Sequence, residues 1–269
     1  MAEFTDADLS GSQLTQVRMS GARFDRVDFS DVRGRSVLFT GAFLHDVDLS
    51  GAVLRGVYAA RAEISGHIES LTVNGVDVAP LVDAELNRRY PDRAKMRPVD
   101  PAGFREAWKI LTRLWDQTVA RARRLPPGLL HESVDGEWSF IETLRHLVFA
   151  TDAWIRRGIL GDPSPWDPLD LPWDEMPDTP GVPRDRGARP SLETVLELRR
   201  DRMSTVREVI AGLTAQSLDA ETKPVQGPGW PPPRSFPVRE CLLVILNEEW
   251  EHRLYSERDL DALEARDVG

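Results

Sequence analysis

Val47-Asp48-Leu49-Ser50-Gly51 is one unit of a five-residue pattern that runs from Phe4 to Ile64. One position in each unit holds a bulky apolar residue, and the position two residues earlier never holds a residue larger than valine. The bulky series, in which only Gly34 and Ala59 are small, is Phe4, Leu9, Leu14, Met19, Phe24, Phe29, Gly34, Phe39, Leu44, Leu49, Leu54, Ala59 and Ile64. A period of five fits neither a helix nor a strand. The pattern therefore predicts a repeat architecture, in which stacked units bury together what one unit cannot bury alone.

Two of these units carry the signature of a known family. Ala7-Asp8-Leu9-Ser10-Gly11 and the unit at 47–51 resemble the A-(D/N)-(L/F)-X-X unit of pentapeptide-repeat proteins. The resemblance implies a right-handed quadrilateral β-helix with one repeat per side and both apolar positions directed into the shaft. The pattern ends after Ile64, and residues 68–78 alternate around Asn74-Gly75. This alternation predicts a β-hairpin that closes the rod.

The composition changes near residue 80. All eight Trp lie between Trp108 and Trp250, and all twenty Pro lie from Pro80 onward. We therefore predict a repeat β-helix with its terminal hairpin over 1–79, a linker or short helix over 80–100, and a helical domain over 101–269. The sequence has neither a run of eighteen apolar residues nor a basic-then-apolar leader, which predicts a soluble, cytoplasmic protein. The net charge of −10 argues against nucleic acid and anionic membranes as partners.

Apolar residues at three- and four-residue spacing predict four long helices in the second part of the chain. The expected ranges are 102–124, 139–160, 191–213 and 238–263, with a short helix over 80–90. Ser139 and Glu142 form a capping box at the start of the second long helix. Four long amphipathic helices predict a bundle. The stretch 161–189, rich in Pro, Asp and Trp, is then a long connection of a kind that often serves function.

Glu248 and His252 lie one turn apart on the last predicted helix, in a stripe that also holds Cys241, Ile245 and Tyr255. A carboxylate and an imidazole are costly to bury without partners, and a divalent metal satisfies both. His146 lies within an apolar stretch of the second long helix and offers a third ligand. The alternative is a solvated Glu–His pair on the helix surface.

From Phe104 to Leu260 the chain resembles the DinB-like superfamily of four-helix bundles. Residues 144–148, Leu-Arg-His-Leu-Val, resemble its first signature, and residues 247–253, Asn-Glu-Glu-Trp-Glu-His-Arg, resemble the second. Many members have His-x-x-x-His on the last helix, whereas this chain has Glu-x-x-x-His, which the mycothiol-dependent maleylpyruvate isomerases of the superfamily also use. The resemblance implies that His146, Glu248 and His252 bind a divalent metal, zinc or nickel, and leave at least one coordination position open.

The resemblance also implies a metal-dependent and thiol-dependent transferase or isomerase. The metal would activate a low-molecular-weight thiol such as mycothiol for attack on a small-molecule substrate. A second class of function stays open, namely a non-catalytic interaction protein whose rod docks a partner or mimics DNA and whose metal is structural. Residues 1–78 hold eleven Asp and Glu against seven Arg, a net of 7 − 11 = −4, and the interspersed arginines disfavour DNA mimicry.

For several other residues the sequence predicts only whether they are buried or exposed. Three tryptophans of the Pro-rich loops form a wall of the site or simply pack: Trp166, Trp173 and Trp230. We expect surface positions for three arginines close in sequence to the ligands: Arg145, Arg239 and Arg253. Cys241 is expected to be a small buried hydrophobe. Three histidines without a companion at ligand spacing are expected to be structural or exposed: His45, His67 and His131.

Overall fold

The computed structural model describes residues 4–13, 15–17, 19, 21, 24, 27–44, 47–66 and 68–267. The chain divides into two compact units, Met1–Ile64 and Ser65–Gly269. Three residues named above lie outside the described residues: Leu14, His45 and His67.

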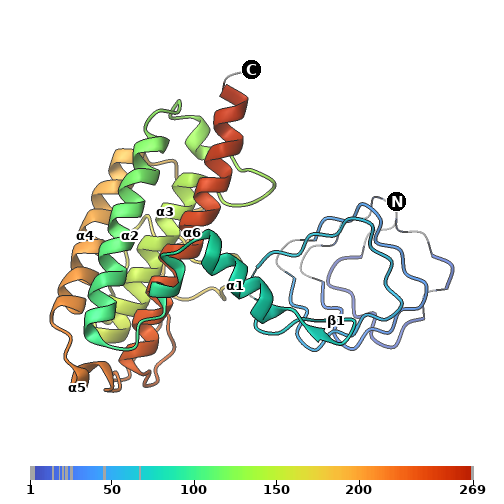
Figure 1. Cartoon of the computed structure of the whole chain (residues 1–269), viewed down its shortest axis with the longest axis horizontal. Helices are drawn as coiled ribbons and strands as arrows, with labels where there is room; N and C mark the ends of the chain where they lie inside the picture. Colours follow the sequence, from blue (N-terminus) through green and yellow to red (C-terminus); the bar gives the residue numbers. More distant parts are fainter. Residues whose placement is uncertain are drawn as a thin grey trace. The chain divides into compact units, whose positions relative to one another are not determined.

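The backbone of the first unit turns once every five residues (Figure 1). In the series 6, 11, 16 and onward to 56, every described position has a positive φ, between 50° and 72°. Gly and Asp, which tolerate this left-handed conformation, occupy most of these corners. The carboxylates of Asp8, Asp28 and Asp48 each accept a hydrogen bond from the backbone N–H two residues later, at 2.9, 2.7 and 2.8 Å. These three bonds recur every twenty residues, so four repeats make one turn of the coil.

The large apolar residues of the repeat are exposed in the structure. The exposed fractions of Phe29, Phe39 and Leu54 are 56%, 67% and 73%. The described residues of the first unit also contain no strand. The structure therefore has the corners that a β-helix requires, but its described residues lack the buried apolar shaft that the sequence predicts. The physical reason is that turn bonds such as Ser12 N–H to Leu9 O, at 3.0 Å, fix each corner locally, whereas a shaft closes only when neighbouring coils pack on one another.

The predicted hairpin is present at the start of the second unit. Strands β1 (Thr72–Val73) and β2 (Val76–Asp77) pair antiparallel, with Val73 opposite Val76. Asn74 and Gly75 have φ values of 50° and 83°, as a two-residue hairpin turn with two left-handed positions requires. The hairpin belongs to the helical unit, whereas the sequence pattern assigns it to the rod.

The second unit is a helical bundle whose long helices match the predicted ranges. Its helices are α1 (Ala79–Arg89), η1 (Arg93–Met96), α2 (Pro101–Ala122), η2 (Leu129–His131), α3 (Phe140–Thr151), η3 (Asp152–Ile159), α4 (Leu192–Ala211), α5 (Ala215–Leu218) and α6 (Val238–Asp267). The four long helices form a ring in which α2 packs on α4, α4 on α3, α3 on α6, and α6 on α2 (Figure 1). Both capping bonds of Ser139 and Glu142 start α3 as predicted. Within the described part of the chain, none of the helices combines the length and the apolar character needed to cross a bilayer.

The bundle interior contains two buried ion pairs that the apolar pattern does not reveal. Arg199 of α4 makes a two-pronged contact with Glu249 of α6, at 2.7 and 2.8 Å. Arg202 of α4 does the same with Asp152, the first residue of η3, at 2.9 and 2.8 Å. These pairs tie α4 to α6, which carries Glu248 and His252, and to η3, which directly follows α3.

Candidate metal centre

His146, Glu248 and His252 come together between α3 and α6. Glu248 Oε2 lies 3.3 Å from His146 Nε2 and 3.1 Å from His252 Nε2. One donor atom from each residue lies within 4.8 Å of the other two. The two residues of α6 are one turn apart, so a single helix face presents both, and α3 supplies the third from the facing wall. The structure thus brings together the three residues that the family resemblance implies as ligands.

The orientation of His146 is set by a bond on its far side. Its Nδ1 lies 3.0 Å from the carbonyl oxygen of Leu171, which can only accept a hydrogen bond. We therefore assign the ring proton to Nδ1, which leaves Nε2 as a lone pair directed at Glu248. A ligand histidine held through its other nitrogen by a backbone carbonyl is typical of protein metal sites.

Electrostatics in the cluster call for a cation. Burial lowers the pKa of His146, which favours its neutral form. Burial opposes ionisation of Glu248, but the neighbouring imidazole groups outweigh burial and lower the pKa of this carboxyl group. A neutral His146 with its proton on Nδ1 and an ionised Glu248 then present two acceptor atoms 3.3 Å apart. A metal ion between them removes the repulsion.

The spacing of the donor atoms also fits such an ion. Zinc bonds to imidazole nitrogen and carboxylate oxygen are about 2.0–2.2 Å long, which at a tetrahedral angle separates the donors by about 3.3 Å. Glu248 Oε2 lies 3.3 and 3.1 Å from the two imidazole nitrogens, and all three donor atoms lie within 4.8 Å of one another. The side chains of Glu248 and His252 are 28% and 19% exposed, so the cluster can be reached from solvent on the α6 side.

Trp138 covers one side of the cluster and was not singled out from the sequence. Its ring centroid lies 4.5 Å from that of His146 and 5.8 Å from that of His252, with the latter pair stacked at 17°. Its indole N–H donates to Asp174 at 3.4 Å, which links it to the long connection. The available signal was its place next to Ser139, because the residue before a helix cap lies over the first turn of that helix.

The loop tryptophans pack beside the site. Phe149, whose ring centroid is 6.1 Å from that of His146, stacks on Trp166 at 5.7 Å and contacts Trp173 at 6.2 Å. Trp173 in turn meets Trp230 edge-on at 5.0 Å. These residues form one apolar cluster with Met176. They support the wall behind His146.

The three arginines that lie close in sequence to the ligands differ in their burial. Arg239 is half-exposed and bonds Asp219 and the carbonyl oxygen of Val99. The predicted surface positions of Arg145 and Arg253 are wrong, because both are buried, with exposed fractions of 0% and 8%. Arg145 satisfies its donors with backbone carbonyl groups, and Arg253 lies over the ring of Trp250 at 5.4 Å. Cys241 is fully buried, as expected. His131 is half-buried.

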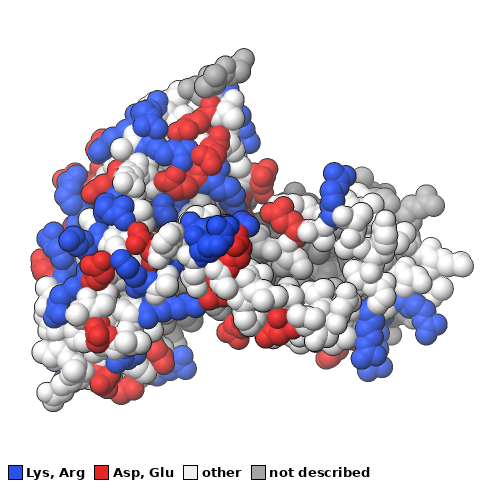
Figure 2. Space-filling model, viewed as in Figure 1, with Lys and Arg blue, Asp and Glu red and all other residues white. Residues whose placement is uncertain are grey.

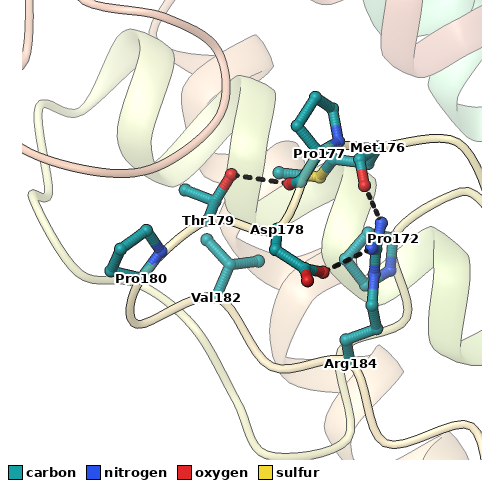
Figure 3. A pocket seen from close by; sticks show the side chains of 8 residues that line it. All are labelled: Pro172, Met176, Pro177, Asp178, Thr179, Pro180, Val182 and Arg184. Atoms are coloured by element: carbon teal, nitrogen blue, oxygen red, sulfur yellow. Dashed lines mark hydrogen bonds and ion pairs between the residues drawn. The ribbon is translucent and has the colours of Figure 1, made fainter.

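A hollow of about 320 Å³ lies on the long connection (Figure 3). Its lining residues are Pro172, Met176, Pro177, Asp178, Thr179, Pro180, Val182 and Arg184. Arg184 donates to Asp178 at 2.8 Å and to the carbonyl oxygen of Met176, and these bonds brace one wall of the hollow. None of the three candidate ligands lines it. It begins at Pro172, directly after the Leu171 carbonyl group that holds His146.

Comparison with known families agrees with this geometry. The profile of the DinB superfamily matches residues 110–256, and that of pentapeptide repeats matches residues 2–33 with eight copies. The chain belongs to the DinB superfamily, with pentapeptide repeats fused in front of the superfamily domain. No curated protein and no solved structure matches the chain significantly.

Proposed function

We propose that the helical unit is a metal-dependent transferase or isomerase that uses a low-molecular-weight thiol. The observation that carries the proposal is the cluster of His146, Glu248 and His252, whose donor separations of 3.3 and 3.1 Å suit zinc or nickel. A coordinated thiol is deprotonated near neutral pH, and this is the chemistry that the metal supplies. Membership in the DinB superfamily and the Glu-x-x-x-His spacing support a thiol such as mycothiol as the nucleophile.

The residues of the chain have distinct roles in this proposal. Glu248 and His252 present their donor atoms from successive turns of one helix, so their separation changes little. Trp138 shields the cluster on one side, and the partial exposure of Glu248 leaves access from another. The hollow beside Pro172 has the size of small-molecule sites, which are about 300–1,000 Å³, and we assign it to the body of the thiol or of its substrate.

The test begins with metal content. The purified full chain should hold close to one zinc or nickel per chain, and His252→Ala and Glu248→Ala should each hold far less, because two ligands rarely retain a metal that three hold. Asn247→Ala is the matched control, since Asn247 is exposed and adjacent to Glu248 on the same helix. Full metal content in the ligand variants would refute the site.

A second measurement tests the thiol. Calorimetric titration of the metal-loaded chain with mycothiol should give saturable binding that His252→Ala abolishes and Asn247→Ala preserves. A conjugation assay with an electrophilic substrate should show the same dependence. A chain that binds metal but no low-molecular-weight thiol would refute the enzymatic proposal and leave a structural metal.

We also infer a docking role for the repeat unit, since one observation favours it specifically. Phe39, Leu54 and Tyr58 are 67%, 73% and 92% exposed. Among the described residues, the face of this unit in Figure 2 carries few charged side chains, whereas the helical unit shows both signs interspersed. Exposed apolar patches mark interaction sites. A protein partner that copurifies with the full chain should be lost from Tyr58→Asp and kept by Asn247→Ala, and retention by Tyr58→Asp would refute the role.

A further inference from the structure

Two adjacent residues of α3 bind the long connection at alternate carbonyl groups. Arg145 Nε donates to Leu169 O at 2.8 Å, and His146 Nδ1 donates to Leu171 O at 3.0 Å. Arg145 also reaches the returning arm of the connection, where its guanidinium donates to Asp185 O at 2.6 Å and to Ala188 O at 3.5 Å. A single guanidinium group thus fixes both arms of the connection against α3.

The segment that Arg145 holds has no regular structure of its own, and its buried side chains are those of Asp170 and Leu171. Residues 167–171 contain no helix or strand, and their local bonds are a turn from Asp170 N–H to Asp167 O at 2.9 Å and a side-chain bond from Leu169 N–H to Asp167 at 2.9 Å. These bonds shape the segment but do not attach it to α3. The hydrogen bonds that attach it to α3 come from Arg145 and from His146 itself, in addition to the burial of the Leu171 side chain.

The burial of Arg145 makes its contacts specific. The residue is 0% exposed, and its hydrogen-bond acceptors are backbone carbonyl oxygens of the connection. The fork of a guanidinium group can satisfy several carbonyl groups at fixed angles, which a lysine cannot do. Displacement of the connection would leave a buried charge without partners, so the observed path is strongly favoured.

We propose that Arg145 is a positioning residue for the metal centre: it holds the Leu171 carbonyl group where this group fixes the proton of His146 on Nδ1 and leaves Nε2 free to coordinate. The inference rests on the proposed metal site but makes a claim about the metal-free protein as well. Partners that orient a ligand histidine contribute about 10- to 100-fold to metal affinity. Arg145 acts on His146 indirectly, because it binds the backbone segment that carries the Leu171 carbonyl group.

The structure offers a matched control in Arg157. This arginine is 1% exposed and likewise bonds three carbonyl groups, those of Pro163, Val225 and Gly227, at 2.8, 3.1 and 2.8 Å. It lies twelve residues further along the chain than Arg145, and none of its bonds reaches Leu171. Replacing it removes a buried guanidinium of the same kind without touching the support of His146.

The experiment compares Arg145→Met, Arg145→Lys and Arg157→Met in the full chain. Imidazole ¹⁵N shifts of the metal-free protein report the tautomer of His146, assigned by comparison with His146→Gln. We expect the Nδ1–H form in the parent and in Arg157→Met, and a mixture with the Nε2–H form in Arg145→Met. The zinc dissociation constant should rise about 10- to 100-fold in Arg145→Met and stay within about threefold in Arg157→Met.

Three results would overturn the inference: an Nε2–H tautomer in the parent, parent-like tautomer and affinity in Arg145→Met, or an equal loss in Arg157→Met. If Arg145→Met does not fold, Arg145→Lys, which keeps the charge but loses the fork, provides both readouts. A parent chain that binds no zinc would refute the proposed function, while the tautomer comparison would still decide the role of Arg145.

Discussion

Glu249 provides the sharpest test of the packing around the site. On a helical wheel it lies about 100° from Glu248 and looks like a neutral surface position. In the structure its side chain is 2% exposed and that of its partner Arg199 is 3% exposed, with two hydrogen bonds of 2.7 and 2.8 Å between them. Glu249→Ala leaves a guanidinium group buried without its counter-charge. Removing one partner of such a pair costs about 3–5 kcal/mol.

One contact reduces this cost slightly. Arg199 also lies over the ring of Trp115 at 5.2 Å, an interaction worth about 1 kcal/mol that survives the substitution. We therefore expect Glu249→Ala to lower the free energy of unfolding of the helical unit by about 3–4 kcal/mol. Urea denaturation followed by circular dichroism at the helical band measures it. Asn247→Ala is the control and should change the free energy by less than about 0.5 kcal/mol.

The double variant Arg199→Met/Glu249→Leu separates loss of the pair from loss of packing. Replacing both charges by apolar residues of similar volume is often neutral or stabilising, so the double variant should be within about 1 kcal/mol of the parent. A cost below about 1 kcal/mol for Glu249→Ala, or a double variant as unstable as the single one, would refute the buried pair as described.

Three further outcomes follow. Burial raises the pKa of the Cys241 thiol to about 11, against about 8.5 in an unfolded chain. Its contribution to stability is therefore complete below about pH 8.5 and is lost as the pH rises towards 11. Cys241→Ala should flatten the alkaline fall in unfolding free energy, and an unchanged slope would contradict the raised pKa. Ser139→Ala removes the cap of α3 and should cost about 1 kcal/mol in urea denaturation, and no loss would argue against the capping box. Phe39→Asp should match Thr40→Asp in circular dichroism and limited proteolysis, because both positions are exposed; selective disruption by Phe39→Asp would instead mean that Phe39 is buried in the shaft of a closed β-helix.

Interactions between residues close in sequence were sufficient to predict several features of this structure. The Asn74-Gly75 turn forms because both residues accept a left-handed backbone, and α3 starts at Ser139 because its side chain and that of Glu142 satisfy the free N–H groups of the first turn. Glu248 and His252 share a face because the helix repeats every 3.6 residues. Each of these facts depends on residues fewer than five positions apart.

The features that sequence reasoning missed depend on contacts between distant residues. Arg145 looks like a surface residue because arginine is rarely buried, and only the return of the connection over α3 supplies the carbonyl groups that make its burial favourable. The same holds for Glu249, whose partner is fifty positions away. In the repeat unit the five-residue period correctly predicts the corners, which are local. Its prediction that Phe39 is buried is wrong, because burial requires contact between coils and Phe39 is exposed.

The ligand set shows how these two kinds of information combine. Spacing alone brings Glu248 and His252 together, but it does not decide which nitrogen of His146 faces them. That choice depends on the carbonyl group of Leu171, twenty-five positions further along and held near α3 by the residue next to His146. The candidate metal centre therefore depends on the bundle together with its long connection. A transplant of α3 and α6 without residues 161–191 should keep the three ligands but lose the tautomer that lets His146 coordinate.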